Sequence, residues 1–400
     1  MMRKIVLSIA WQVMISYPLL SSCQWIGKQP AEETTVKQMT AEDWFEAGLD
    51  FEKLGHSEDA VKAYSNALET NPNYSEAYYQ RGRIWSDRGE FDKAVDDFTR
   101  VLEMDPLHFK AYCERGFAWD SEGEYDRAMV DYTKALEVDP RYAKAYYNRA
   151  GVWSDKEDYD KAIADYTTAL EIDPRYAKAY NNRGVAWDAK GDIDRAIVDY
   201  ARALEIDPFF AQAYYNRAGA WSDKGEIEQA ISDYTKVLEI DTRHARAYYN
   251  RGGLWRTKGN INQAIVDYTS ALEIDPQFAE AYYKRGVLWC EKGDPDQAID
   301  DHTRALEIDP RYAEAYNNRG LAWGIKGDYD QAIADYTKAL VINPGSAEAY
   351  YNLGFAWYQK GDLQRALAEA KRALSLRPTN AMYQSVVPYL EAQIKSSGKK

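Results

Sequence analysis

Tryptophan returns every 34 residues through most of this chain. Nine tryptophans keep this interval: Trp85, Trp119, Trp153, Trp187, Trp221, Trp255, Trp289, Trp323 and Trp357. A fixed period of this length indicates a stack of similar supersecondary units, each of which buries its apolar face against its neighbours. The period therefore overrules the prior expectation that a chain of 400 residues forms two or three globular domains.

The stretch 177–210 represents the unit, and its residues are numbered here as positions 1 to 34. Its first half places Tyr180, Arg183, Gly184 and Trp187 at positions 4, 7, 8 and 11. This spacing puts the four side chains on one face of a helix. Gly191 at position 15 ends the helix, because glycine readily adopts the left-handed conformation of a helix C-terminus.

A second helix is predicted for the rest of the unit. Asp192 can cap its first turn, and its inward face carries Ala196, Tyr200, Ala203 and Leu204. Small residues on both helices let the two backbones approach, so that the large aromatic side chains fill the remaining space. Pro208 ends the unit, since the residue before proline is disfavoured in a helix.

This helix-turn-helix unit of 34 residues resembles the tetratricopeptide repeat. Ten copies fill residues 41–380, starting at residues 41, 75, 109, 143, 177, 211, 245, 279, 313 and 347, and every copy has alanine at position 20. The resemblance implies an all-α, right-handed solenoid whose first helices line a concave groove that binds proteins. We expect residues 381–395 to form a capping helix, kinked or split at Pro388, and residues 396–400 to be a disordered tail.

The N-terminus predicts export. Residues 1–22 have a basic head and an apolar run typical of a signal peptide. Leu20-Ser21-Ser22-Cys23 resembles the bacterial lipobox, which implies a lipid on Cys23, and glutamine at position 24 implies the periplasmic face of the outer membrane. The alternative is ordinary cleavage that leaves a soluble periplasmic or secreted protein. Residues 23–40 are predicted to be a flexible tether, with Thr40 and Asp43 as a capping box for the first helix.

Composition argues against several functions. The net charge is −14, with 64 acidic and 50 basic residues, so general nucleic-acid binding is not expected. No metal-ligand spacing, phosphate loop or nucleophile motif is present in the sequence. We therefore predict no enzyme activity, no cofactor and no metal site. His302 stands at position 24, where seven copies have tyrosine, and is expected in the core.

Arginine at position 7 is matched by aspartate at position 23 in copies two to nine. The pairs are Arg81 and Asp97, Arg115 and Asp131, Arg149 and Asp165, Arg183 and Asp199, Arg217 and Asp233, Arg251 and Asp267, Arg285 and Asp301, and Arg319 and Asp335. The first copy lacks both partners, with Ala47 and Ala63, and the tenth has Leu353 with Glu369. We predict that the pairs are structural salt bridges.

Asparagine recurs at position 6, next to tyrosine at position 5. These residues are Asn148, Asn182, Asn216, Asn250, Asn318 and Asn352, with Tyr147, Tyr215 and Tyr249 beside three of them. The resemblance places both positions on the groove. A side-chain amide carries a donor and an acceptor, so a row of them could hold the backbone of an extended peptide.

Two classes of function fit these observations. The first is a non-catalytic scaffold, exported and lipid-anchored at the bacterial envelope, that binds an unknown protein or peptide in the groove. The second is a glycan or peptidoglycan receptor that stacks sugar rings on the groove tyrosines. A cytosolic co-chaperone fits less well, because the carboxylate clamp of such proteins is incomplete here: Asn148 and Lys178 match it, but the lysine at position 5 and the asparagine at position 9 are missing.

One copy departs at the turn. Nine copies have glycine at position 15, whereas the fourth has Glu157. A residue with a side chain is strained in a left-handed turn, so this position predicts a local weak point.

Overall fold

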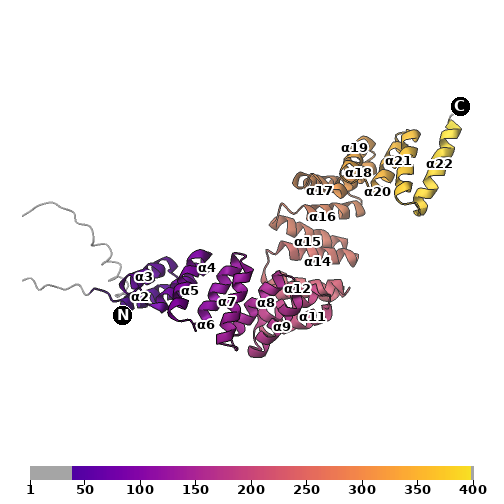
Figure 1. Ribbon diagram of the computed structural model, residues 1–400. Coiled ribbons are helices and arrows are strands. Elements are labelled where there is room, and N and C mark those ends of the chain that lie inside the picture. Colours follow the sequence, from indigo (N-terminus) through magenta and orange to yellow (C-terminus); the bar gives the residue numbers. More distant parts are fainter. Residues whose placement is uncertain (1–37, 398–400) are drawn as a thin grey trace, which may run out of the picture. The chain divides into compact units, whose positions relative to one another are not determined.

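The computed structural model describes residues 38–397 (Figure 1). The predictions for the signal peptide, Cys23 and most of the tether therefore lie outside the described residues. The chain divides into two compact units, one up to Ala77 and the other from Tyr78 onward. The first unit contains the helix pair α2 (Ala41–Lys53) and α3 (Ser57–Thr70), which pack against each other.

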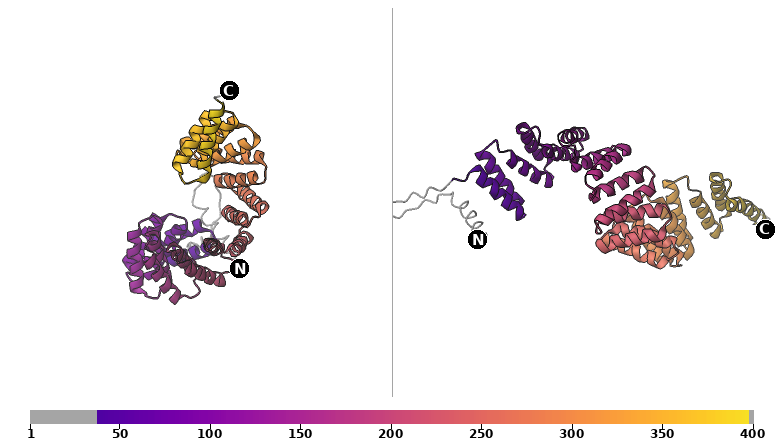
Figure 2. Two further views of the ribbon diagram at one scale, coloured as in Figure 1. Left: turned by 90° about the vertical axis from the view of Figure 1, so that its right-hand side faces the viewer. Right: turned by 90° about the horizontal axis from the view of Figure 1, so that it is seen from below.

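The second unit continues the pattern of helix pairs, and we call the first helix of each pair helix A and the second helix B. The A helices are α4 (Ser75–Asp87, which begins three residues before this unit), α6 (Phe109–Ser121), α8 (Ala143–Asp155), α10 (Ala177–Ala189), α12 (Ala211–Asp223), α14 (Ala245–Thr257), α16 (Ala279–Glu291), α18 (Ala313–Lys326) and α20 (Ala347–Gln359). The B helices are α5 (Phe91–Met104), α7 (Tyr125–Val138), α9 (Tyr159–Ile172), α11 (Ile193–Ile206), α13 (Ile227–Ile240), α15 (Ile261–Ile274), α17 (Pro295–Ile308), α19 (Tyr329–Ile342) and α21 (Leu363–Leu376). The secondary structure of residues 38–397 is all helical, and each pair is followed by the next along the unit (Figures 1 and 2). The predicted all-α fold of regular helix pairs is confirmed.

The helix ends follow from local residues. The Thr40 hydroxyl accepts from the Asp43 amide while the Asp43 carboxylate accepts from the Thr40 amide, which confirms the predicted capping box. Asp192 caps α11 by accepting from the Arg195 amide at 3.2 Å. Gly191 between α10 and α11 has a φ of 81°, the left-handed conformation expected at a helix C-terminus.

The core of each pair lies where its two helices face each other. In α10 and α11, a methyl group on Gly184 would lie only 2.7 Å from the Tyr200 ring, so glycine is required for this close approach. Ala196, Ala203 and Tyr200 are almost completely buried, as predicted. Trp187 is half-buried, and the guanidinium of Arg195 lies 4.5 Å from its ring centroid.

Successive pairs are joined by a second set of contacts. The B helix of one pair packs against the A helix of the next. Most lysines at position 14 reach an acidic side chain 30 residues earlier, as in Lys224 to Asp194 at 2.5 Å and Lys258 to Glu228 at 2.9 Å. These ion pairs are largely exposed, so they contribute less to stability than the buried interface does.

The last helix, α22 (Ala381–Ser397), packs on α21. It contains Pro388 but runs as one helix, so the predicted split does not occur. Tyr383 and Leu390 are each 4% exposed, which shows that the helix buries part of its surface against the preceding pair. The helix extends beyond residue 395, and residues 398–400 lie outside the described residues. Within the described part of the chain, every helix is too short or too polar to span a lipid bilayer.

Candidate functional site

The arginine at position 7 makes two fixed contacts. Arg183 donates from Nε and Nη2 to the two carboxylate oxygens of Asp199, each at 2.7 Å, and from Nη1 to the Thr167 hydroxyl at 3.0 Å. Asp199 belongs to the same pair of helices, whereas Thr167 belongs to the preceding one. The guanidinium therefore links the two helices of its own repeat and also ties that repeat to its neighbour.

The same bidentate geometry recurs from α4 to α19. Arg149 donates to Asp165 at 2.7 and 2.8 Å, and Arg285 donates to Asp301 at 2.8 and 2.7 Å. Burial raises the pKa of the Asp301 carboxyl even though Arg285 lowers it. The guanidinium is thus the main compensation for a carboxylate that has lost its water, and the pairs give no sign of a reactive group.

The asparagines at position 6 are joined to the preceding repeat. Asn182 donates from Nδ2 to the Tyr147 hydroxyl at 3.1 Å, and Asn216 donates to Asn181 at 3.0 Å. The others follow the same rule, one residue at position 6 donating to position 5 of the repeat before it: Asn148 to Cys113, Asn250 to Tyr215, Asn318 to Tyr283 and Asn352 to Asn317. These amides therefore help to join each repeat to the preceding one, and their predicted role in holding a peptide stays a prediction.

The tyrosines at position 5 pack inside the repeat. The Tyr147 ring lies 4.8 Å from the Tyr176 ring and 5.8 Å from the Tyr166 ring, measured between centroids. Tyr215 and Tyr249 have the same surroundings, with His244 and Phe278 at 5.0 and 4.8 Å. Neighbouring rings thus cover part of each tyrosine, which leaves less of the ring free to stack on a sugar.

A polar pocket opens over the A helices α12, α14 and α16. Its volume is about 510 Å³, and Tyr249 and Asn250 from the predicted groove set line it. The remaining lining residues are Gly219, Ser222, Asp223, Tyr234, Gly253, Leu254, Arg256, Thr257, Tyr268 and Lys284. Most of them occupy positions 5, 6, 9, 12 and 13 of their A helices, and we call these positions the A face.

Glycine at position 9 creates this opening. Phe117, Val185, Leu321 and Phe355 occupy the same position in other repeats, where they are 41–49% exposed. A methyl group on Gly219 would meet nothing within 4 Å, and one on Gly253 would only touch the Tyr268 hydroxyl at 3.7 Å. Glycine inside a helix costs about 1 kcal/mol relative to alanine, and here no packing contact requires it.

The pocket has opposite charges at its two ends. Asp223 lies on α12, and the pKa of Asp188 on α10 is raised by burial and, to a smaller extent, by the Asp223 carboxylate. Arg256 on α14 donates to Glu291, while Lys284 on α16 lies 5.6 Å from the centroid of its neighbour, the Tyr283 ring. Among residues 38–397, Lys284 has no carboxylate within ion-pair distance. The site can therefore accept an anionic group at one end and a cationic group at the other.

Sequence reasoning found two residues of this pocket and missed what opens it. The available signal was the loss of a bulky side chain at position 9 and the change from asparagine to Lys284 at position 6. Both are departures from the repeat pattern, whereas the prediction concentrated on residues that recur in most copies.

The thiols and imidazoles of residues 38–397 offer no evident reactive centre. Cys113 and Cys290 are free thiols, and burial raises the pKa of Cys113 to about 12, which disfavours the nucleophilic thiolate. His302 is completely buried, and its pKa falls to about 4 because burial disfavours the charged ring and Arg319 adds repulsion. In this part of the chain, histidine, cysteine and carboxylate side chains form no group of three that could hold a metal ion.

Comparison with known families agrees with this architecture. Models described as tetratricopeptide repeat match residues 45–109, 109–142, 143–176, 177–210, 211–244, 279–312 and 347–380, and one described as TPR repeat matches 256–289 and 325–361. Together these matches cover well over half of the chain. The chain belongs to the tetratricopeptide repeat family. Members of this family generally serve as interaction scaffolds for protein or peptide partners.

Several solved structures are similar to this chain. The C-terminal part of a repeat protein from Cytophaga hutchinsonii is 20% identical with a TM-score of 0.52, over 60% of this chain and 98% of that one. MamA is 32% identical with a TM-score of 0.40, over 42% of this chain and 97% of that one. YrrB, described as having an unusual peptide-binding site, is 26% identical with a TM-score of 0.43, over 47% of this chain and 96% of that one. A search of curated proteins gave no match.

Proposed function

We propose that this chain is a non-catalytic adaptor that binds an extended peptide segment of a partner protein on the A face, centred on the polar pocket over α12, α14 and α16. The observation that carries the proposal is that two successive repeats, the sixth and the seventh, have glycine at position 9, namely Gly219 and Gly253. They open the surface at a cost in helix stability that no internal contact explains. Glycine is the residue that permits close approach of another backbone.

The pocket offers groups for such a segment. Asn250 donates from Nδ2 to the hydroxyls of Tyr215 and Tyr234, at 3.0 and 3.2 Å, so its Oδ1 is oriented and can accept from a peptide N–H. Lys284 and Arg256 would bind a carboxylate of the partner, and Asp223 would bind a cationic side chain. The other asparagines of the A face extend the same surface along the neighbouring repeats.

A peptide library displayed on phage and selected on the 400-residue chain would test this proposal. Gly219→Leu fills the pocket, and we expect it to weaken binding of the selected peptides at least tenfold, about 1.4 kcal/mol. Gly151→Leu is the matched control, because Gly151 lies in the nearly identical sequence NRAGVWSD and also has nothing within 4 Å of its Cβ position. Equal binding by the Gly219→Leu variant and the wild type would exclude this pocket.

The proposal places the adaptor at the bacterial envelope, exported and held by a lipid on Cys23, at the periplasmic face of the outer membrane. Its support is the N-terminal sequence alone, in which a basic head and an apolar run precede Leu20-Ser21-Ser22-Cys23.

A further inference from the structure

The tenth repeat lacks the buried aromatic side chain that each of the nine earlier repeats has at position 24. Position 24 carries a buried aromatic ring in the first nine copies: Tyr64, Phe98, Tyr132, Tyr166, Tyr200, Tyr234, Tyr268, His302 and Tyr336. In the tenth copy this position is Ala370. The helix pair α20 and α21 therefore has no ring of its own where each earlier pair has one.

The neighbouring glycine shows the vacated space. Where copies one to nine have glycine at position 8, a methyl group on it would lie 2.4 to 3.2 Å from the ring at position 24, as for Gly320 at 2.8 Å from Tyr336. The three atoms nearest to a methyl group on Gly354 would instead be main-chain and Cβ atoms of α21, the first being the Ala366 carbonyl oxygen at 3.1 Å.

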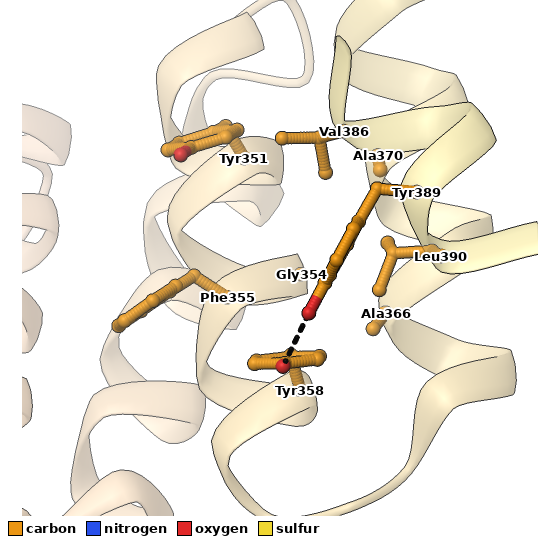
Figure 3. A pocket seen from close by; sticks show the side chains of 9 residues that line it. All are labelled: Tyr351, Gly354, Phe355, Tyr358, Ala366, Ala370, Val386, Tyr389 and Leu390. Atoms are coloured by element: carbon orange, nitrogen blue, oxygen red, sulfur yellow. Dashed lines mark hydrogen bonds between the residues drawn. The ribbon is translucent and has the colours of Figure 1, made fainter. Parts of the chain in front are cut away.

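A pocket of about 250 Å³ occupies this place, between α20, α21 and α22. Figure 3 shows Tyr351, Phe355 and Tyr358 of α20 opposite Val386, Tyr389 and Leu390 of α22, with Gly354, Ala366 and Ala370 completing the lining. The lining is thus apolar and rich in aromatic rings. Its polar feature is the pair of hydroxyls of Tyr358 and Tyr389, which are 3.1 Å apart.

The pocket is accessible from the surface. Phe355 and Tyr389, on opposite sides of it, are 49% and 48% exposed, whereas Leu390 behind them is 4% exposed. An apolar cavity of about 150 Å³ is enough to bind benzene in an engineered protein, so this one can take a single substituted ring. Aromatic rings also favour contact with one another beyond their buried area.

We propose that this pocket binds one aromatic side chain, phenylalanine or tyrosine, of a partner polypeptide. The bound ring takes the place of the ring that the tenth repeat lacks at Ala370. A tyrosine hydroxyl would reach the hydroxyl pair of Tyr358 and Tyr389. This site is separate from the polar pocket over α12, α14 and α16, shares no residue with it, and stands whether or not that pocket binds a peptide.

The direct test uses amino-acid amides as probes. The 400-residue chain, labelled at its valine and leucine methyl groups, is titrated with N-acetyl-tyrosine amide, N-acetyl-phenylalanine amide and N-acetyl-leucine amide. We expect saturable shifts of the Val386 and Leu390 methyl signals with the two aromatic probes. These two probes should bind at least tenfold more tightly than the leucine probe. Absence of saturable shifts, or equal affinity for the leucine probe, would overturn the proposal.

Filling the pocket supplies the second test. Ala370→Phe restores the ring of the other repeats, so it should raise the melting temperature and weaken both aromatic probes at least tenfold. Tyr336→Phe, which keeps a ring at the same position of the ninth repeat, should leave probe binding unchanged. If Ala370→Phe does not fold, Ala370→Leu fills part of the space and should still weaken binding. Unchanged affinity in a folded filling variant would show that the probes bind elsewhere.

Discussion

Glu157 occupies in the fourth repeat the turn position that glycine occupies in the other nine. Its φ is 58°, and the nine glycines have φ from 74° to 83°. The predicted left-handed conformation of Glu157 is therefore confirmed. Glu157→Gly should be neutral or stabilising by about 1 kcal/mol, because it removes the strain of a side chain in this conformation. The midpoint of urea unfolding measures the effect.

Gly225 gives the reciprocal control, since it follows the same Ser-Asp-Lys sequence in the sixth repeat. Its φ is 77°, and a methyl group there would meet nothing within 4 Å. Gly225→Glu should therefore cost about 1 kcal/mol from backbone strain alone. If Glu157→Gly destabilised the protein, the turn strain would not be the controlling factor.

The Arg183 and Asp199 pair makes a second prediction at the residue scale. Asp199 is 4% exposed, so Arg183→Leu leaves a buried carboxylate without its counter-charge. We expect a loss of about 3 to 5 kcal/mol in the free energy of unfolding. Replacing both partners with leucine should cost less than the single change, because no charge then stays buried.

Arg202→Leu is the control for this experiment. Arg202 pairs with Glu205 on the surface, where the two side chains are 59% and 61% exposed. Exposed pairs contribute little, so this variant should unfold like the wild type. Equal stability of the Arg183→Leu variant and the wild type would contradict the structural role assigned to the pair.

His302 predicts a pH dependence of stability. Its folded pKa of about 4 lies below the ordinary value of 6.5, so the unfolded state binds a proton that the folded state refuses. The contribution of neutral His302 to the free energy of unfolding is therefore fully present above pH 6.5 and is lost as the pH falls toward 4. His302→Tyr restores the residue of seven other repeats. Relative to this variant, the wild type should lose up to about 3 kcal/mol in the free energy of unfolding between pH 7 and pH 4. Parallel pH profiles for the two proteins would contradict the assignment.

At the scale of the helix, the sequence was sufficient to predict the two helices of the repeat, their ends and their inward faces. Helix ends depend on neighbouring residues, such as Asp192 and Gly191, and the inward face depends on a period that ten copies repeat. Of the two alternatives predicted at Pro388, a kink or a split, the split does not occur, because α22 is one helix. Proline removes one backbone donor. The burial of Tyr383 and Leu390 on either side of it favours the continuous helix, because tertiary packing supplies most of the stability of a helix.

Contacts between repeats were harder to predict. The asparagine amides bond to position 5 of the preceding repeat, a pairing 35 residues apart that depends on how one pair docks on the next. The two pockets arise where a repeat departs from the pattern, through Gly219 and Gly253 in one case and Ala370 in the other. A periodic signal describes what every copy shares, and a binding site that differs from copy to copy is not part of that signal.

At the scale of the whole molecule, each repeat contacts mainly its neighbours, so the array can present two sites with different chemistry in different repeats. The polar pocket over α12, α14 and α16 suits a charged, extended segment, and the pocket between α20 and α22 suits one aromatic ring. Tyr351, Phe355 and Tyr358 of the second pocket occupy A-face positions, as most residues of the first pocket do. A single partner chain could therefore supply both groups, and binding of the two in tandem would then be stronger than binding of either one.

The location of the molecule supplies the last prediction. If Cys23 carries a lipid, the chain sits at a membrane, and two or more acyl chains hold a protein far more firmly than one. Expressed with its N-terminus in a two-membrane bacterium, the wild type should sediment with membranes, and Cys23→Ala should move nearly all of it to the soluble fraction. Cys290→Ala, which changes a free thiol inside the array, should sediment like the wild type. Membrane association that survives Cys23→Ala, with no acyl mass on the mature wild-type N-terminus, would show that the protein reaches the envelope without this anchor.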